Sequence, residues 1–210
     1  MTSASWEASL GDVPPVADGS AHAKRLVADY GEIARFVDAL FRYASTDTFV
    51  SLRSFHHDPR RPPADIRAVR LRLDDEGFAT LVRMASARAT HVANLASPAV
   101  FAPPICTFKT KSSAAESNLA EGLALSVECD RSPAEARLLL QGLLGPATVV
   151  VASGGLWIDP ATGEAHDKLH LHWRLSEPAA EPGDHARLKR ARRLAARLAG
   201  ADASAVPAVH

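Results

Sequence analysis

The stretch DKLHLHWRL, residues 167–175, decides how the second half of this chain folds. Alternate side chains of an extended strand point to the same face of a sheet. One face therefore carries Lys168, His170, His172 and Arg174, and the other carries Leu169, Leu171, Trp173 and Leu175. We expect a strand whose leucine face packs in a core. Its cationic face meets either water or a ligand.

The sequence before this strand predicts a helix between two further strands. LALSVECD (123–130) alternates as a strand should, and PATVVVASGG (146–155) is rich in β-branched residues. Between them, Ser132 is the expected N-cap, with Pro133 at the first helical position and Glu135 completing a capping box. IDPATGE (158–164) then predicts a turn that leads back into the strand of residues 167–175.

The first half of the chain predicts a layer of helices and strands. Residues 1–20 lack any hydrophobic period and are expected to form a loose arm. We expect helices at 22–43 and 74–93, strands at 47–55 and 65–73, an extended segment at 99–111, a helical or loop connection at 112–122, and an arginine-rich helix at 184–200. The predicted fold class is α+β, with one domain over 21–210 divided into an N-terminal layer (21–118) and a catalytic half (119–210).

Composition excludes several classes of protein. With 210 residues, 47% hydrophobic and 23% charged residues and a formal net charge of zero, the chain reads as an ordinary globular protein. Cys106 and Cys129 are too few for a disulfide framework or a four-cysteine zinc site. No run of about 18 apolar residues predicts a membrane span, and the N-terminus lacks the pattern of a signal peptide. We therefore expect a cytoplasmic location and no membrane partner.

Two acidic residues stand one residue apart at the end of the strand 123–130. Alternation places Ala124, Ser126, Glu128 and Asp130 on one face. Carboxylates that close repel each other, so a cation, a neighbouring lysine or arginine, or solvent must neutralise them. Mg²⁺ and Mn²⁺ prefer hard oxygen ligands and leave coordination positions for water and phosphates. Either a metal site or an exposed pair of carboxylates fits this spacing.

Four motifs together resemble a known family. LSVECD (125–130), VVVASGG (149–155), KLHLHWRL (168–175) and LAGADASAVPAVH (198–210) resemble the primase domains of plasmid and phage replication proteins, in the archaeo-eukaryotic primase (primase-polymerase) superfamily. The resemblance covers about residues 120–210. It implies that Glu128, Asp130 and Asp202 bind two metal ions, Mg²⁺ or Mn²⁺, and that His170 contacts the phosphates of the incoming nucleotide. It also implies a small antiparallel sheet of RNA-recognition-like topology backed by helices.

The resemblance implies a DNA primase, or primase-polymerase, that makes primers on single-stranded DNA for plasmid, phage or mobile-element replication. Its expected partners are the DNA template, nucleoside triphosphates and a replicative helicase domain or protein. The expected nucleotide-binding residues are Ser153, Gly154, Gly155, Lys168, His170, His172 and Arg174. Because the third motif stands almost at residue 210, we expect the sequence to be a piece of a longer replication protein.

Three other readings remain open at this point. The HLH triplet also matches the metal motif of replication-initiator nucleases, although Tyr30 and Tyr43 precede it rather than follow it. His170, His172 and a carboxylate suit a zinc hydrolase by ligand type alone. A non-catalytic nucleic-acid-binding module is favoured by the arginine-rich helix at 184–200, if that helix contacts phosphates rather than water.

Overall fold

The computed structural model describes residues 25–45, 47–56, 60–97 and 99–201. The expected arm at 1–20 and the expected metal ligand Asp202 lie outside these ranges. The elements, in chain order, are α1 (Tyr30–Phe41), β1 (Thr48–His56), β2 (Asp65–Leu71), α2 (Asp75–Ala93), β3 (Ala99–Ala102), β4 (Cys106–Phe108), a short 3₁₀ turn (Glu116–Asn118), β5 (Leu119–Cys129), α3 (Pro133–Leu144), β6 (Val149–Ile158), β7 (Ala165–Ala179) and α4 (Pro182–Leu198). The predicted α+β class is confirmed.

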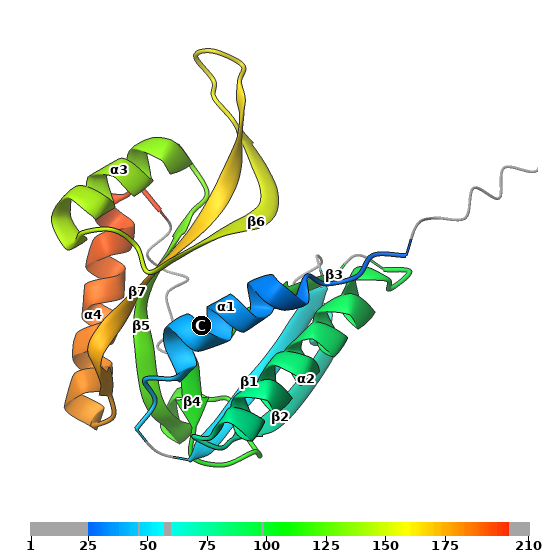
Figure 1. Ribbon diagram of the computed structural model, residues 1–210. Helices are drawn as coiled ribbons and strands as arrows, with labels where there is room; N and C mark the ends of the chain where they lie inside the picture. Colours follow the sequence, from blue (N-terminus) through cyan, green and yellow to red (C-terminus); the bar gives the residue numbers. More distant parts are fainter. Residues whose placement is uncertain (1–24, 46, 57–59, 98, 202–210) are drawn as a thin grey trace, which may run out of the picture.

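The strands of the described residues form one curled antiparallel sheet, a half-barrel. Its order is β2-β1-β4-β5-β7-β6, and β3 pairs with β1 beside this path. β5 and β6 both pair with β7, so α3 connects two strands that have β7 between them. β6 is an edge strand, and the β6–β7 hairpin projects beyond the rest of the molecule (Figure 1).

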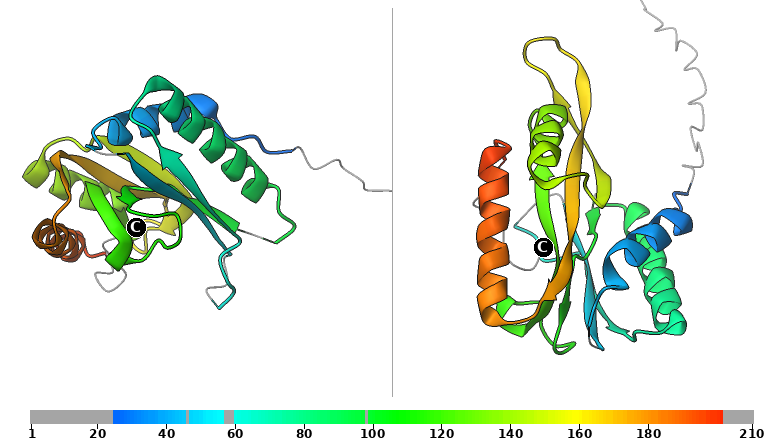
Figure 2. Two further views of the ribbon diagram at one scale, coloured as in Figure 1. Left: turned by 90° about the horizontal axis from the view of Figure 1, so that it is seen from below. Right: turned by 60° about the vertical axis from the view of Figure 1, so that its left-hand side comes forward.

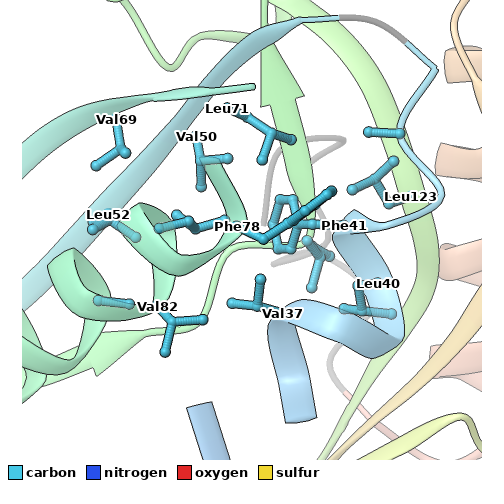
Figure 3. Packing of buried hydrophobic residues seen from close by; sticks show 14 of the residues in the cluster. Val37, Leu40, Phe41, Val50, Leu52, Val69, Leu71, Phe78, Val82 and Leu123 are labelled. Carbon is cyan, nitrogen blue, oxygen red and sulfur yellow. The ribbon is translucent and has the colours of Figure 1, made fainter. Parts of the chain in front are cut away.

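The N-terminal layer packs its helices on β1 and β2. Val37, Leu40 and Phe41 of α1 and Phe78, Leu81 and Val82 of α2 meet Val50, Leu52, Val69 and Leu71 in one hydrophobic cluster (Figure 3). Burying each such side chain contributes about 1.5–3 kcal/mol to folding. Leu123 and Ala124 of β5 belong to the same cluster, so this core extends to the second half of the chain.

The second half packs α3 and α4 on the opposite face of the sheet (Figure 2). Val127 and Cys129 of β5 and Leu171 and Trp173 of β7 are buried there with Ala136, Leu140, Ala195 and Ala196 of the two helices. The indole nitrogen of Trp173 donates to the carbonyl of Gly145 over 2.9 Å. The predicted alternation is confirmed from Leu125 to Cys129 and from Leu169 to Trp173, where the apolar side chains pack under α3 and α4. It is wrong at Leu123, which lies at a register shift and packs with Ala124 in the N-terminal cluster.

Two local predictions about helix starts are wrong. α1 begins at Tyr30 rather than near residue 22, because Asp29 caps it by accepting from the backbone N–H of Glu32. Residues 25–28 have no regular secondary structure, and the N–H of Leu26 donates to the side chain of Asn94, which caps the end of α2. Ser132 stands before α3 with φ 40°, a left-handed conformation, and its side chain makes no cap, so the predicted capping box does not form. Pro133 is at the helix start as predicted.

The predicted connection at 112–122 is partly strand. β5 begins at Leu119, because Gly122 pairs with Cys106 and Glu121 pairs with Thr107 of β4. The carboxylate of Glu121 is buried and accepts hydrogen bonds from Ser45 and Thr107. None of the helices in the described ranges combines the length and the apolar character needed to cross a membrane.

Candidate polar site on the sheet

The register of β5, β7 and β6 arranges the polar residues in rows across the sheet. Glu128 pairs with His170, which pairs with Val151 on its other side. In the next row Ser126 pairs with His172, which pairs with Val149. Residues directly opposite each other on neighbouring strands share one face and have Cα atoms about 4.5–5.5 Å apart. Glu128 and His170 are therefore neighbours on the face that α3 and α4 leave uncovered.

A pocket of about 180 Å³ opens over these rows and is called the polar pocket below. It is lined by Ser51, Arg53, Val100–Cys106, Phe108, Ser126, Glu128, Val151–Ser153, His170 and His172. β4 lies between β1 and β5 in the sheet and is only three residues long. Beyond β4 the strands β1 and β5 are not connected by a strand of the described residues, and the polar pocket lies between them there. Four of the residues predicted from the sequence, Glu128, Ser153, His170 and His172, thus meet residues of the N-terminal layer in one pocket.

Asp130 and Lys168 extend the polar site by one row. Asp130 follows the end of β5, has a side chain 55% exposed, and lies 3.6 Å from the Nζ of Lys168. The aliphatic stem of Lys168 lies against Gly155, where a Cβ would be only 2.9 Å from Cδ. The sheet register shifts between Ala152 and Leu156, and Gly154 there has φ 81°, so this segment is an irregularity that glycine permits. Lys168 and Asp130, both predicted to be site residues, therefore form an ion pair with each other.

His172 differs from His170 in its surroundings. It is 4% exposed, its Nδ1 shares a 2.9 Å hydrogen bond with the hydroxyl of Ser126, and its ring meets the ring of Phe36 edge-on at 5.7 Å between centroids. Burial, followed by the positive charges of His170 and Arg192, lowers the pKa of His172 to about 3. The imidazole is therefore neutral at physiological pH. Within the described ranges, its buried Nε2 has no hydrogen-bond partner.

Arg174 lies outside the polar pocket. Its guanidinium stacks 3.6 Å above the ring of Tyr43 and donates to the carbonyl of Ala39 at the end of α1. Its backbone N–H donates to the hydroxyl of Thr148. Arg174 shares the predicted face with His170 and His172, but its contacts join the two halves of the chain rather than line the pocket.

Two arginines near the site were not singled out by the sequence. Arg53 of β1 lines the polar pocket, and burial lowers its pKa. Arg192 of α4 is 1% exposed and donates to the carbonyl of Ala124 over 2.6 Å, and burial lowers its pKa to about 10. The signal for Arg192 was its spacing with Leu188, Ala195 and Ala196, the buried positions of the helix. Arg53 gave no comparable signal, because its role depends on how β1 lies relative to β5.

The donor set for a metal ion is incomplete within the described ranges. Those ranges hold no cluster of three or more acidic, histidine or cysteine side chains placed to bind a metal ion. Glu128 and Asp130 supply two carboxylates on one face, and the third expected ligand, Asp202, lies outside the described residues. Ala201, the last described residue before Asp202, packs on the hydrophobic cluster under α3 and α4, on the face of the sheet opposite to Glu128. The two described carboxylates fit a hard divalent cation in ligand type.

Comparisons of the chain with protein-family models, with curated proteins and with solved structures find no match.

Proposed function

We propose that this chain is a DNA-directed nucleotidyltransferase of the primase-polymerase kind, which makes primers on single-stranded DNA. One observation carries the proposal: Glu128 and His170 are opposite each other in register and line the same pocket, with Asp130 and Lys168 in the adjacent row. Phosphoryl transfer needs carboxylates that hold divalent cations beside cations that hold a triphosphate. These two rows place both kinds of group side by side.

The arrangement of the second half supports the same proposal. β5, α3, β6, β7 and α4 follow one another with α3 and α4 on one face, as in a split β-α-β unit. This is the order expected of an RNA-recognition-like half. The polar pocket lies on the opposite face, between the two halves of the chain. A template and a nucleotide entering there would contact both halves.

In the proposed reaction the 3′-hydroxyl of an initiating nucleotide or growing primer loses its proton to water and its oxygen bonds to the α-phosphate of a nucleoside triphosphate. The bond from the α-phosphate to the bridging oxygen breaks, and pyrophosphate leaves. Mg²⁺ or Mn²⁺ ions held by Glu128, Asp130 and Asp202 would supply a lower pKa for the attacking hydroxyl and neutralise the developing charge. His170 donates from a ring nitrogen to a phosphate oxygen. Lys168, whose ammonium group lies 3.6 Å from Asp130, would donate to the phosphates beside His170.

The nuclease reading is less well supported by this geometry. A metal site built from His170 and His172 requires both imidazoles to reach one ion. Both histidines line the polar pocket, but His172 is only 4% exposed, with Ser126 at its Nδ1 and Phe36 against its ring, whereas His170 stands beside Glu128. One observation supports the alternative of a non-catalytic nucleic-acid-binding module: the side chains of Arg190, Arg193 and Arg197 on α4 are exposed. Helix α4 lies on the opposite face of the sheet from the polar pocket.

The proposal is tested by primer synthesis on single-stranded DNA with labelled nucleotides and Mn²⁺. The double variant Glu128→Ala, Asp130→Ala should lose synthesis and keep its fold, because both side chains are exposed. A matched control, Glu135→Ala with Glu177→Ala, removes two exposed carboxylates elsewhere and should retain full synthesis. Wild-type protein that makes no primers, or a double variant that still makes them, would overturn the proposal.

His170→Ala provides an independent check on the phosphate contact. Loss of one charge-assisted contact costs about 1.5–3 kcal/mol, so the nucleotide concentration needed for half-maximal synthesis should rise roughly tenfold to a hundredfold. His172→Ala should raise it only modestly, because His172 is buried between Ser126 and Phe36. If both variants lose metal binding equally and the wild type nicks DNA without nucleotides, the nuclease reading is correct.

A further inference from the structure

A second, larger pocket adjoins the polar pocket. It has a volume of about 750 Å³ and is called the apolar pocket below. Its walls are formed by Ile33 and Phe36 of α1, Ala85 and Ala89 of α2, and Val149 and Val151 of the edge strand β6. Figure 1 shows α1 passing beneath β6, with α2 on the other side of α1. The volume lies within the usual range for small-molecule sites, about 300–1,000 Å³.

The two pockets form one cleft. Phe101, Pro103, Pro104, Val151 and Ala152 line both of them. At the junction, Val151 is opposite His170 and Val149 is opposite His172 in the strand register. Neighbouring strands are about 4.8 Å apart, so an anionic group held at His170 is one strand away from the apolar wall.

The polarity of the cleft changes sharply at this junction. On one side stand Glu128, His170 and Arg53, and on the other stand Phe36 and Val149. Phe36 of the apolar pocket meets the ring of His172 of the polar pocket edge-on, so this aromatic contact marks the boundary beside the residues that line both pockets. Such a cleft suits a ligand with a charged end and a flat, weakly polar end of nucleoside size.

We propose that the apolar pocket holds the base and sugar of the incoming nucleoside triphosphate whose phosphates lie in the polar pocket. The inference rests on the proposed function and adds to it the place of the nucleoside. It also predicts little preference among the four bases. The charged side chains at the rim on α1 are engaged with each other, Glu32 with Arg35 and Asp38 with Arg42, so the walls offered to a base are mainly apolar. A template-directed enzyme needs such an unselective site.

The test compares ligands that share phosphates and differ in the nucleoside. Binding of ATP, CTP and inorganic tripolyphosphate is measured by calorimetry in Mg²⁺. Ala89→Trp fills the apolar pocket from α2, and Val149→Trp fills it from β6 in case the first variant does not fold. Ala87→Trp is the matched control, because Ala87 lies two residues away on α2 and is exposed. Each filling variant should weaken ATP and CTP about tenfold, through lost burial of the nucleoside, and leave tripolyphosphate within about twofold.

The outcomes separate this inference from the proposed function. If the wild type binds neither nucleotides nor tripolyphosphate, or His170→Ala changes neither affinity, the proposed function fails. If His170→Ala weakens all three ligands while both filling variants leave ATP unchanged, the proposed function stands and the apolar pocket does not hold the nucleoside. Filling variants that weaken single-stranded DNA but not ATP would assign the pocket to the template and would also overturn the inference.

Discussion

The burial of His172 predicts a specific dependence of stability on pH. The ordinary pKa of histidine is 6.5, and burial lowers that of His172 to about 3 in the folded protein. A base whose pKa is lowered by folding binds its proton more weakly in the folded state than in the unfolded state. The stability held at pH 7.5 is therefore lost as the pH falls below 6.5, and the loss continues down to about pH 3.

The magnitude follows from these two pKa values. At pH 5.0 the unfolded histidine is almost fully protonated and the folded one is almost fully neutral, and one pKa unit corresponds to about 1.36 kcal/mol. His172 should therefore reduce the free energy of unfolding by about 2 kcal/mol between pH 7.5 and pH 5.0. The neighbours that oppose its protonation are His170 and Arg192.

The assay is urea unfolding of the wild type and of His172→Gln at both pH values. Glutamine does not titrate and can still hydrogen-bond to Ser126. The other titrating groups are common to both proteins, so the loss of stability on acidification should be about 2 kcal/mol smaller in the variant. In ¹³C-histidine NMR spectra of the wild type, one imidazole should keep the chemical shift of a neutral ring down to pH 5. This signal should be missing from the spectrum of His172→Gln. Equal losses in both proteins, or a His172 signal that titrates near pH 6.5, would refute the burial argument.

Two further predictions concern the core. Gly77→Ala should destabilise the protein by about 2–4 kcal/mol, because a Cβ there would lie 2.2 Å from the backbone oxygen of Arg72. Gly142→Ala in α3 places its Cβ where no atom lies within 4 Å, so it should stabilise the protein by about 0.5–1 kcal/mol. Urea unfolding midpoints that shift in the same direction for both variants would contradict this packing. Burial raises the pKa of Cys106 and of Cys129 to about 11. Both thiols should therefore resist a thiol reagent at pH 7 and react only in denaturant. Rapid labelling of the native protein would contradict their burial.

The strands and helices of the second half were largely predictable because their signals are local. The period of two over residues 125–129 and 169–173 separates an apolar face from a polar face, and the helices α3 and α4 cover the apolar face. Glu128 and His170 were placed on the right faces for the same reason. The predicted start of α1 was wrong because Asp29 caps the helix at Tyr30, and the predicted capping box was wrong because Ser132 adopts a left-handed conformation.

The sequence by itself determined which side chains share a face, because alternation along a strand is fixed by backbone geometry. Only the tertiary structure decided which faces meet. The pairing of Glu128 with His170 depends on the register between β5 and β7, and the approach of Arg53 depends on β4 being too short to close the sheet between β1 and β5. The difference between the two histidines has the same origin. His170 and His172 are equivalent in the alternating pattern and both line the polar pocket, but α1 places Phe36 against His172 alone. Contacts between segments more than a hundred residues apart are set by packing, which no local pattern encodes.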